Sequence, residues 1–207
     1  MYHLATQPAW AVAARAEVHR VIGSERVPSY DDIAEMPIVT AVINESMRLL
    51  PAAPTILRVA TRDVSLRRSA PCSTSVSDAG YVADNASFSS SLPELHIKAG
   101  TVVQLGTGST HRDPLLWERP EEFNPERFLA GSAPSLVHPL AFAPFGVGPR
   151  SCIGQQFAMQ ESRLILATLL QRTEWELAPS YVHAPIPFIT LTPKFKLPMV
   201  LRRHLPA

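Results

Sequence analysis

Cys152 lies in the segment FGVGPRSCIG, just before a region with helical spacing. The thiolate is the reactive and metal-binding form of cysteine, and a helix N-terminus and converging backbone N–H groups favour it. Gly146, Gly148 and Gly154 lack a Cβ atom, as is needed where the backbone passes close to a large flat group or adopts positive φ. A thiolate in such surroundings is typical of the proximal ligand of a haem iron.

Two neighbours of the cysteine suit the same chemistry. Arg150 places a fixed cation where it can meet a carboxylate of a bound cofactor, and Phe145 provides an aromatic wall. A cysteine nucleophile is less well supported, because the residues around Cys152 lack the local pattern of a cysteine protease. A phosphate-binding loop is not indicated either, because the third glycine is misplaced and no Gly-Lys pair is present.

Composition and charge exclude several classes of partner. The chain has 207 residues, 46% of them hydrophobic and 18% charged, which suits a globular protein of one or two domains. A net charge of +1 does not support nucleic-acid binding. Cys72 and Cys152 form no disulfide or zinc pattern, so we expect a reducing compartment. The longest apolar run, LILATLL, is far shorter than the roughly 20 residues of a membrane span, so we expect a cytoplasmic chain.

The spacing of apolar residues predicts a mainly helical chain with short strands. Helices are predicted over residues 8–22, 38–50 and 154–171. Strands are predicted over residues 55–60, 64–66, 101–105, 175–179, 187–191 and 197–202. Prolines across residues 113–140 predict an ordered meander without helix or sheet. Residues 67–95 are rich in Ser, Ala and Asp without a period, which predicts a flexible surface insertion.

Three motifs together resemble the cytochrome P-450 superfamily. Its haem-binding loop has Phe, two free positions, Gly, one free, Arg, one free, Cys, one free and Gly. The fixed positions all match, at Phe145, Gly148, Arg150, Cys152 and Gly154. In the family's order, ESMR also matches the ExxR helix with Glu45 and Arg48, and FNPERF matches the meander motif with Arg127. The resemblance covers nearly the whole chain.

The resemblance implies a fold and a set of site residues. Residues 1–207 would form a partial domain, mainly α with small β-sheets (α+β), equivalent to the C-terminal, proximal part of the family's fold. Cys152 would be the axial iron ligand of haem b, with Gly146 and the fixed residues of the loop around the cofactor. Arg58 matches a position that often contacts a haem propionate, and an exposed strand arginine is the alternative interpretation.

The resemblance also implies that Glu45, Arg48 and Arg127 form a buried network that holds the meander beneath the haem. The alternative is a solvated surface pair of Glu45 and Arg48, which would contribute only ~0.2–0.5 kcal/mol to stability. His111 and Arg112, in HRDPLLW, are interpreted as packing and turn residues.

The activity implied is that of a haem-thiolate monooxygenase. Such an enzyme inserts one oxygen atom of dioxygen into a small apolar organic substrate and receives electrons from a reductase on the cysteine side. Full-length relatives are often anchored to the endoplasmic reticulum membrane. We find no Ala-Gly-x-Asp/Glu-Thr segment of the family's distal helix, so no catalytic residue is identified. The alternative is therefore a truncated, non-catalytic fragment that binds haem or a partner.

The predicted insertion yields a direct test. Deleting residues 70–92 should shift the urea midpoint of unfolding only slightly, because a segment without periodicity buries little and loop entropy varies slowly with length. The ends of the segment should join two neighbouring strands. A large loss of stability on deletion would contradict this interpretation.

Overall fold

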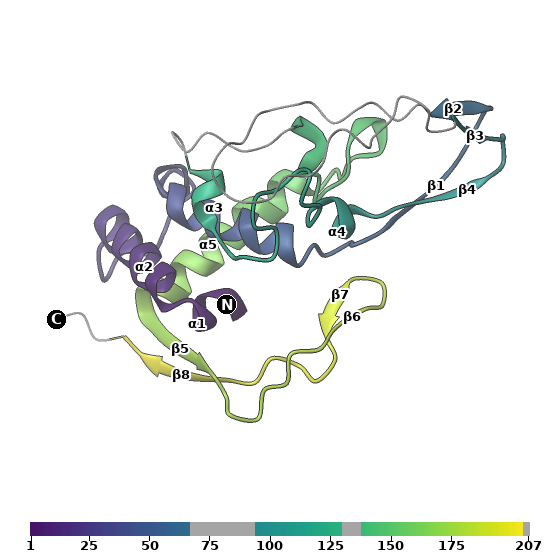
Figure 1. Cartoon of the computed structure of the whole chain (residues 1–207). Helices are drawn as coiled ribbons and strands as arrows, with labels where there is room; N and C mark the ends of the chain where they lie inside the picture. Colours follow the sequence, from purple (N-terminus) through teal and green to yellow (C-terminus); the bar gives the residue numbers. More distant parts are fainter. Residues whose placement is uncertain (67–93, 130–137, 205–207) are drawn as a thin grey trace, which may run out of the picture.

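The structure is a computed structural model that describes residues 1–66, 94–129 and 138–204, and Figure 1 shows a helical body from which two-stranded ribbons extend. The longer helices are α2 (Pro8–Ile22), α3 (Pro37–Leu49) and α5 (Gln155–Arg172). The short helical turns are α1 (Tyr2–Thr6), η1 (Asp32–Glu35), α4 (Thr107–Thr110), η2 (Pro125–Phe128), η3 (Pro139–Ala141) and η4 (Gly148–Arg150). The strands are β1 (Ile56–Val59), β2 (Val64–Leu66), β3 (Leu95–Ile97), β4 (Val102–Leu105), β5 (Thr173–Leu177), β6 (Pro185–Pro187), β7 (Leu191–Pro193) and β8 (Met199–Arg203). A mainly helical chain with small sheets confirms the predicted fold class.

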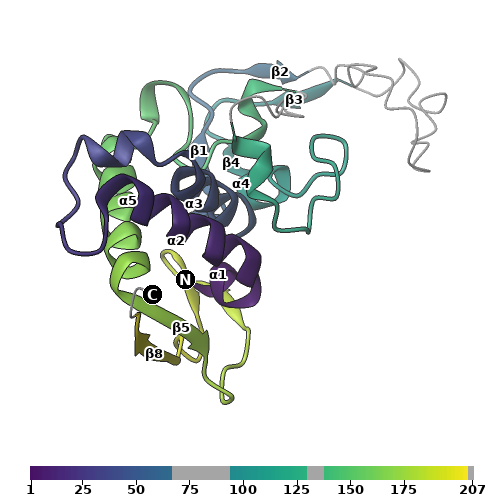
Figure 2. The same ribbon diagram turned by 90° about the vertical axis from the view of Figure 1, so that its left-hand side faces the viewer.

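Helices α2, α3 and α5 form the core by packing their apolar faces together, and Figure 2 shows α2 in front of α3 with α5 beside them. Helix α2 begins at Pro8 and ends before Gly23, whose φ of 70° is one that glycine adopts readily. All three helices lie within one residue of their predicted ends. Their buried apolar side chains recur at helical spacing and include Ala14, Val18, Ile22, Val39, Val42, Ile43, Met159, Leu166, Ala167 and Leu170.

Polar side chains join the helix ends. Arg15 of α2 donates to the carbonyls of Leu170 and Thr173, at 3.1 and 2.9 Å, at the C-terminus of α5. Gln171, which is buried, donates to the carbonyl of Gly23 at 2.9 Å. These contacts satisfy carbonyl groups that a helix end leaves without partners, and they fix α5 against α2.

The strands within the described residues form four antiparallel pairs, each of two strands. Strand β1 pairs with β4, and β2 pairs with β3 so that Leu66 lies opposite Leu95. Strand β3 is not among the predicted strands, and it begins at the last residue of the predicted insertion. Residues 67–93 lie outside the described residues, but their flanking strands are neighbours, as expected.

The strand predicted over residues 187–191 is wrong. Strand β6 ends at Pro187 and β7 begins at Leu191, so Phe188 and Ile189 lie at the tip of a hairpin. Each of these two side chains is 86% exposed. The misassignment arose because β-branched and aromatic residues normally indicate a buried strand, whereas here they lie in a turn.

The meander has the predicted character in its described part. Residues 113–129 contain turns, bends and η2, and residues 138–140 include the start of η3, without a strand or an α-helix in either stretch. Asn124 caps η2 by accepting the N–H of Glu126 at 3.1 Å. Trp117 is 2% exposed, so a large side chain anchors the segment.

No helix in residues 1–66, 94–129 or 138–204 is long and apolar enough to cross a membrane.

Candidate functional site

A buried ion pair lies near the end of α3. Glu45 and Arg48 are one helical turn apart and therefore share a face of the helix. Arg48 Nε lies 2.7 Å from Glu45 Oε2, and Arg48 Nη2 lies 2.8 Å from Oε1. Both side chains are 0% exposed. This is a two-pronged, fully desolvated contact, and a solvated surface pair does not describe it.

The remaining donors of Arg48 bind backbone carbonyls of the segment between α4 and η2. Its Nη1 donates to the carbonyls of His111 and Pro120 at 2.7 and 2.6 Å, and its Nη2 donates to the carbonyl of Glu122 at 3.0 Å. The guanidinium carbon lies 5.0 Å from the centre of the Trp117 ring. One buried side chain thus fixes several separate points of the meander to α3.

Glu45 holds the meander through its second set of contacts. Its Oε1 accepts the backbone N–H of Asn124 at 2.8 Å and lies 3.4 Å from Arg127 Nε. Arg127 also donates through Nη2 to the carbonyl of Arg119 at 3.0 Å. Burial lowers the pKa of Arg127, but an arginine starts from so high a value that it stays a cation at neutral pH. The structure therefore brings together all three residues of the predicted network.

His111 connects this network to the cysteine loop. Its side chain is fully buried, and its Nε2 accepts the backbone N–H of Ala143 at 3.0 Å. Burial lowers the pKa of His111 to about 4, so the ring is neutral at physiological pH and can accept this hydrogen bond. Ala143 lies two residues before Phe145, where the loop begins.

The cysteine loop is a closed turn. The N–H of Cys152 donates to the carbonyl of Phe145 at 2.9 Å, which joins the two ends of the segment. Gly146 and Gly148 have φ of 71° and 75°, a region that disfavours side chains, so glycine is required there for backbone geometry. A Cβ atom on Gly154 would lie 3.8 Å from Cys152 Sγ. Gly154 therefore leaves space directly beside the thiol.

The thiol is accessible. Cys152 is exposed and unbridged, and it precedes the first residue of α5 by three positions. Ile153 and Phe157, which follow it in the sequence, are 104% and 69% exposed, so this part of the chain presents apolar side chains to solvent. Among the described residues, the N–H groups of Ile153 and Gly154 donate to no backbone carbonyl. Arg150 is also exposed.

Strand β1 borders the cysteine loop. A Cβ atom on Gly146 would lie 3.5 Å from Ile56 Cδ1. Arg58 is two residues further along β1, so it lies on the same side of the strand as Ile56. Its Nη1 donates to the carbonyl of Leu57 at 2.9 Å. Arg58 therefore lies on the side of β1 that faces the loop.

A model of the family described as "Cytochrome P-450" matches residues 1–71 and 85–199. The chain belongs to the cytochrome P-450 family.

Curated relatives align along nearly the whole chain. Cytochrome P-450 734A1 of Arabidopsis thaliana is 35% identical over 201 residues, which are 97% of this chain and 34% of that protein. Echinocystic acid 23-monooxygenase of Saponaria officinalis is 35% identical over 196 residues, which are 94% of this chain and 33% of that protein. The chain thus spans about a third of the length of the curated relatives it matches.

A solved structure shows the same fold. The crystal structure of the cytochrome P-450DA heme domain superposes with a TM-score of 0.79 at 25% sequence identity. The match covers 99% of this chain and 40% of that domain. The fold of the chain is therefore that of part of a cytochrome P-450.

Two supporting residues of the site were not identified from the sequence. Asn124 precedes Pro125, and an Asn-Pro pair is a helix-start signal that indicates its capping role in η2. Its second role, donating a backbone N–H to Glu45, has no sequence signal. The sequence indicates only a packing role for His111, because its bond to Ala143 likewise depends on how distant segments meet.

The buried network yields a stability test. Glu45→Ala should lower the free energy of unfolding by about 3–5 kcal/mol, because Arg48 and Arg127 remain buried without their counter-charge. Urea unfolding followed by circular dichroism measures this loss. Glu126→Ala, which removes an exposed carboxylate from the same meander, is the matched control and should change little. An unchanged midpoint for Glu45→Ala would contradict the network.

Proposed function

We propose that this chain is the haem-binding part of a haem-thiolate monooxygenase and that the thiolate of Cys152 is the axial ligand of the iron of haem b. The observation that carries the proposal is the closed loop that presents Cys152 to solvent, after two glycines with positive φ and just before α5. Membership of the cytochrome P-450 family supports it, because this family implies a haem cofactor.

The residues around the sulfur fit a haem. The space left by Gly154 adjoins Sγ, and the exposed side chains of Ile153 and Phe157 offer an apolar surface. The N–H groups of Ile153 and Gly154 are free of backbone acceptors in the described part of the chain, so they can donate to the thiolate and moderate its basicity. Phe145, Gly146 and Gly148 would form the rest of the cradle.

Two cations suit the carboxylates of the cofactor. Arg150 lies in the loop itself, and Arg58 lies on the side of β1 that borders the loop. A guanidinium is permanently charged and matches the geometry of a carboxylate, so both residues would hold haem propionates. Because the two residues belong to different elements, they would hold the haem at two separate points.

The activity proposed is insertion of one oxygen atom of dioxygen into a small apolar organic substrate. When bound, the haem would supply the oxygen-activating chemistry, and thiolate ligation favours cleavage of the O–O bond. The chain's own residues would hold the thiolate and bind the propionates, and the network around Glu45 would support the cysteine loop. An electron-donating reductase would dock on the cysteine side. The names of relatives, a hydroxylase and a monooxygenase among them, support this class of reaction.

A second function is considered for residues 1–207 by themselves. The acid and alcohol pair by which the family handles protons on the distal side has no counterpart in the sequence. These residues would then act as a non-catalytic fragment that binds haem or a partner, and would need a polypeptide with the distal part for turnover.

The ligand assignment is tested by spectroscopy. The haem-loaded chain, once reduced, should give a carbon monoxide difference spectrum of the thiolate type. Cys152→Ala should abolish that spectrum because the iron loses its sulfur ligand, whereas Cys72→Ala, the matched control, should retain it. A thiolate-type spectrum that survives Cys152→Ala would show that the assignment is wrong.

The two functions differ in how tightly the consumption of reductant is coupled to the formation of product. Supplied with haem, a reductase and an apolar substrate, residues 1–207 should consume reductant and release mainly hydrogen peroxide or superoxide, because no distal group manages protons or excludes water. The ratio of oxygenated product to reductant consumed measures this. Adding a separately produced distal polypeptide of a relative should raise the ratio. Efficient oxygenation by residues 1–207 without it would contradict the fragment hypothesis.

A further inference from the structure

Helix α3, which carries Glu45 and Arg48, is held at its N-terminus by a side chain from another helix. Both carboxylate oxygens of Glu17, in α2, accept backbone N–H groups: Oε1 from Ile38 and Oε2 from Val39, each at 2.9 Å. Glu17 is only 5% exposed. A buried carboxylate with two short hydrogen bonds to one helix end defines the position of that end closely.

The N-terminus of α3 depends on this outside partner. The residue before the helix, Met36, is apolar and provides no side-chain cap, and Pro37 has no N–H to donate. The next two N–H groups, those of Ile38 and Val39, would lack acceptors without Glu17. The negative charge of Glu17 also complements the positive end of the helix dipole.

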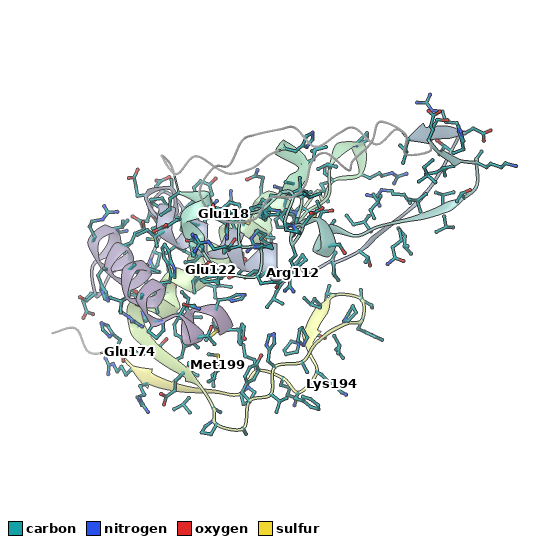
Figure 3. The ribbon with its side chains drawn as sticks, in the orientation of Figure 1. Arg112, Glu118, Glu122, Glu174, Lys194 and Met199 are labelled. Atoms are coloured by element: carbon teal, nitrogen blue, oxygen red, sulfur yellow. The ribbon has the colours of Figure 1, made fainter. Side chains whose placement is uncertain are left out.

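The C-terminus of α3 is held by a cation. Arg112 Nη2 donates to the carbonyl of Leu49, the last residue of the helix, at 2.7 Å. A cation at this end complements the helix dipole, as the anion does at the other. Arg112 also pairs with Glu121 of the meander at 3.1 Å, and Figure 3 labels Arg112 in the same region as the meander residues Glu118 and Glu122.

We propose that Glu17 and Arg112 are positioning residues that clamp α3 from opposite ends and so set the place of the Glu45 carboxylate. Helix α3 has 13 residues and is short enough to move as a rigid rod, so a displacement of either end would also displace Glu45. The bond between Glu45 and the N–H of Asn124 spans 2.8 Å, and a shift of half an ångström or so would weaken it.

The proposal concerns the position of Glu45 against the meander, and it does not rest on haem binding. Its readout is the backbone N–H of Asn124, which reports the position of Glu45 directly. Failure of the haem assignment would leave it intact, and its own failure would leave that assignment intact.

Amide hydrogen exchange of residues 1–207, followed by NMR without denaturant, tests the clamp, because exchange then reports local opening. Glu17→Gln keeps the size of the side chain and removes its charge and one acceptor. It should accelerate exchange at Ile38 and Val39, and also at Asn124, by about tenfold. The matched control is Val18→Ala, which shortens a fully buried side chain next to Glu17 on α2 without removing a hydrogen bond. In this variant, exchange at Asn124 should not accelerate beyond what the loss of global stability explains.

The other end of the helix provides a second test that does not depend on how Glu17→Gln folds. Arg112→Met should accelerate exchange at Asn124, whereas Arg112→Lys, which keeps a cation near Leu49, should largely restore protection. Glu121→Gln removes the surface partner of Arg112 without touching α3 and should have no effect.

Two results would overturn the clamp. One is unchanged protection at Asn124, either in Arg112→Met or in a folded Glu17→Gln variant whose Ile38 and Val39 exchange faster. The contacts at the two ends of α3 would then act only locally. The other is equal acceleration at Asn124 in Val18→Ala, because any loss of stability would then suffice.

Discussion

The buried carboxylate of Glu45 is the contact on which the rest of the site depends. It neutralises Arg48, lies beside Arg127 and accepts a backbone N–H from the meander, all without exposure to water. Burying a charge is costly unless it is paired and hydrogen-bonded throughout, so each of these contacts constrains the others. The meander, which has few regular hydrogen bonds of its own, thereby follows one defined path across α3.

The cysteine loop is linked to this network. Arg48 binds the carbonyl of His111, and the ring of His111 binds the N–H of Ala143, two residues before the loop begins. The loop then closes on itself through the N–H of Cys152 and the carbonyl of Phe145. Beyond it, α5 is fixed to α2 through Arg15. Cys152 therefore lies between two supports, the network before it and the anchored helix after it.

Much of this arrangement could be predicted from the sequence, for identifiable reasons. Helical periodicity and flanking Pro and Gly residues determined α2, α3 and α5 closely, and the resemblance to the cytochrome P-450 family implied that Glu45, Arg48 and Arg127 belong together. The strand predicted at residues 187–191 was wrong because exposed Phe188 and Ile189 have strand-like side chains. The capping role of Glu17 could not be predicted, because its partners are backbone groups of another helix. Such contacts exist only once the helices have packed.

Whether this supported loop presents Cys152 as a metal ligand can be decided by observing the neighbours of the iron. X-ray absorption at the iron edge of the haem-loaded chain reports the first coordination shell. We expect one sulfur neighbour in the wild-type protein and its replacement by a lighter atom in Cys152→Ser. A first shell made only of nitrogen and oxygen in the wild-type protein would contradict it.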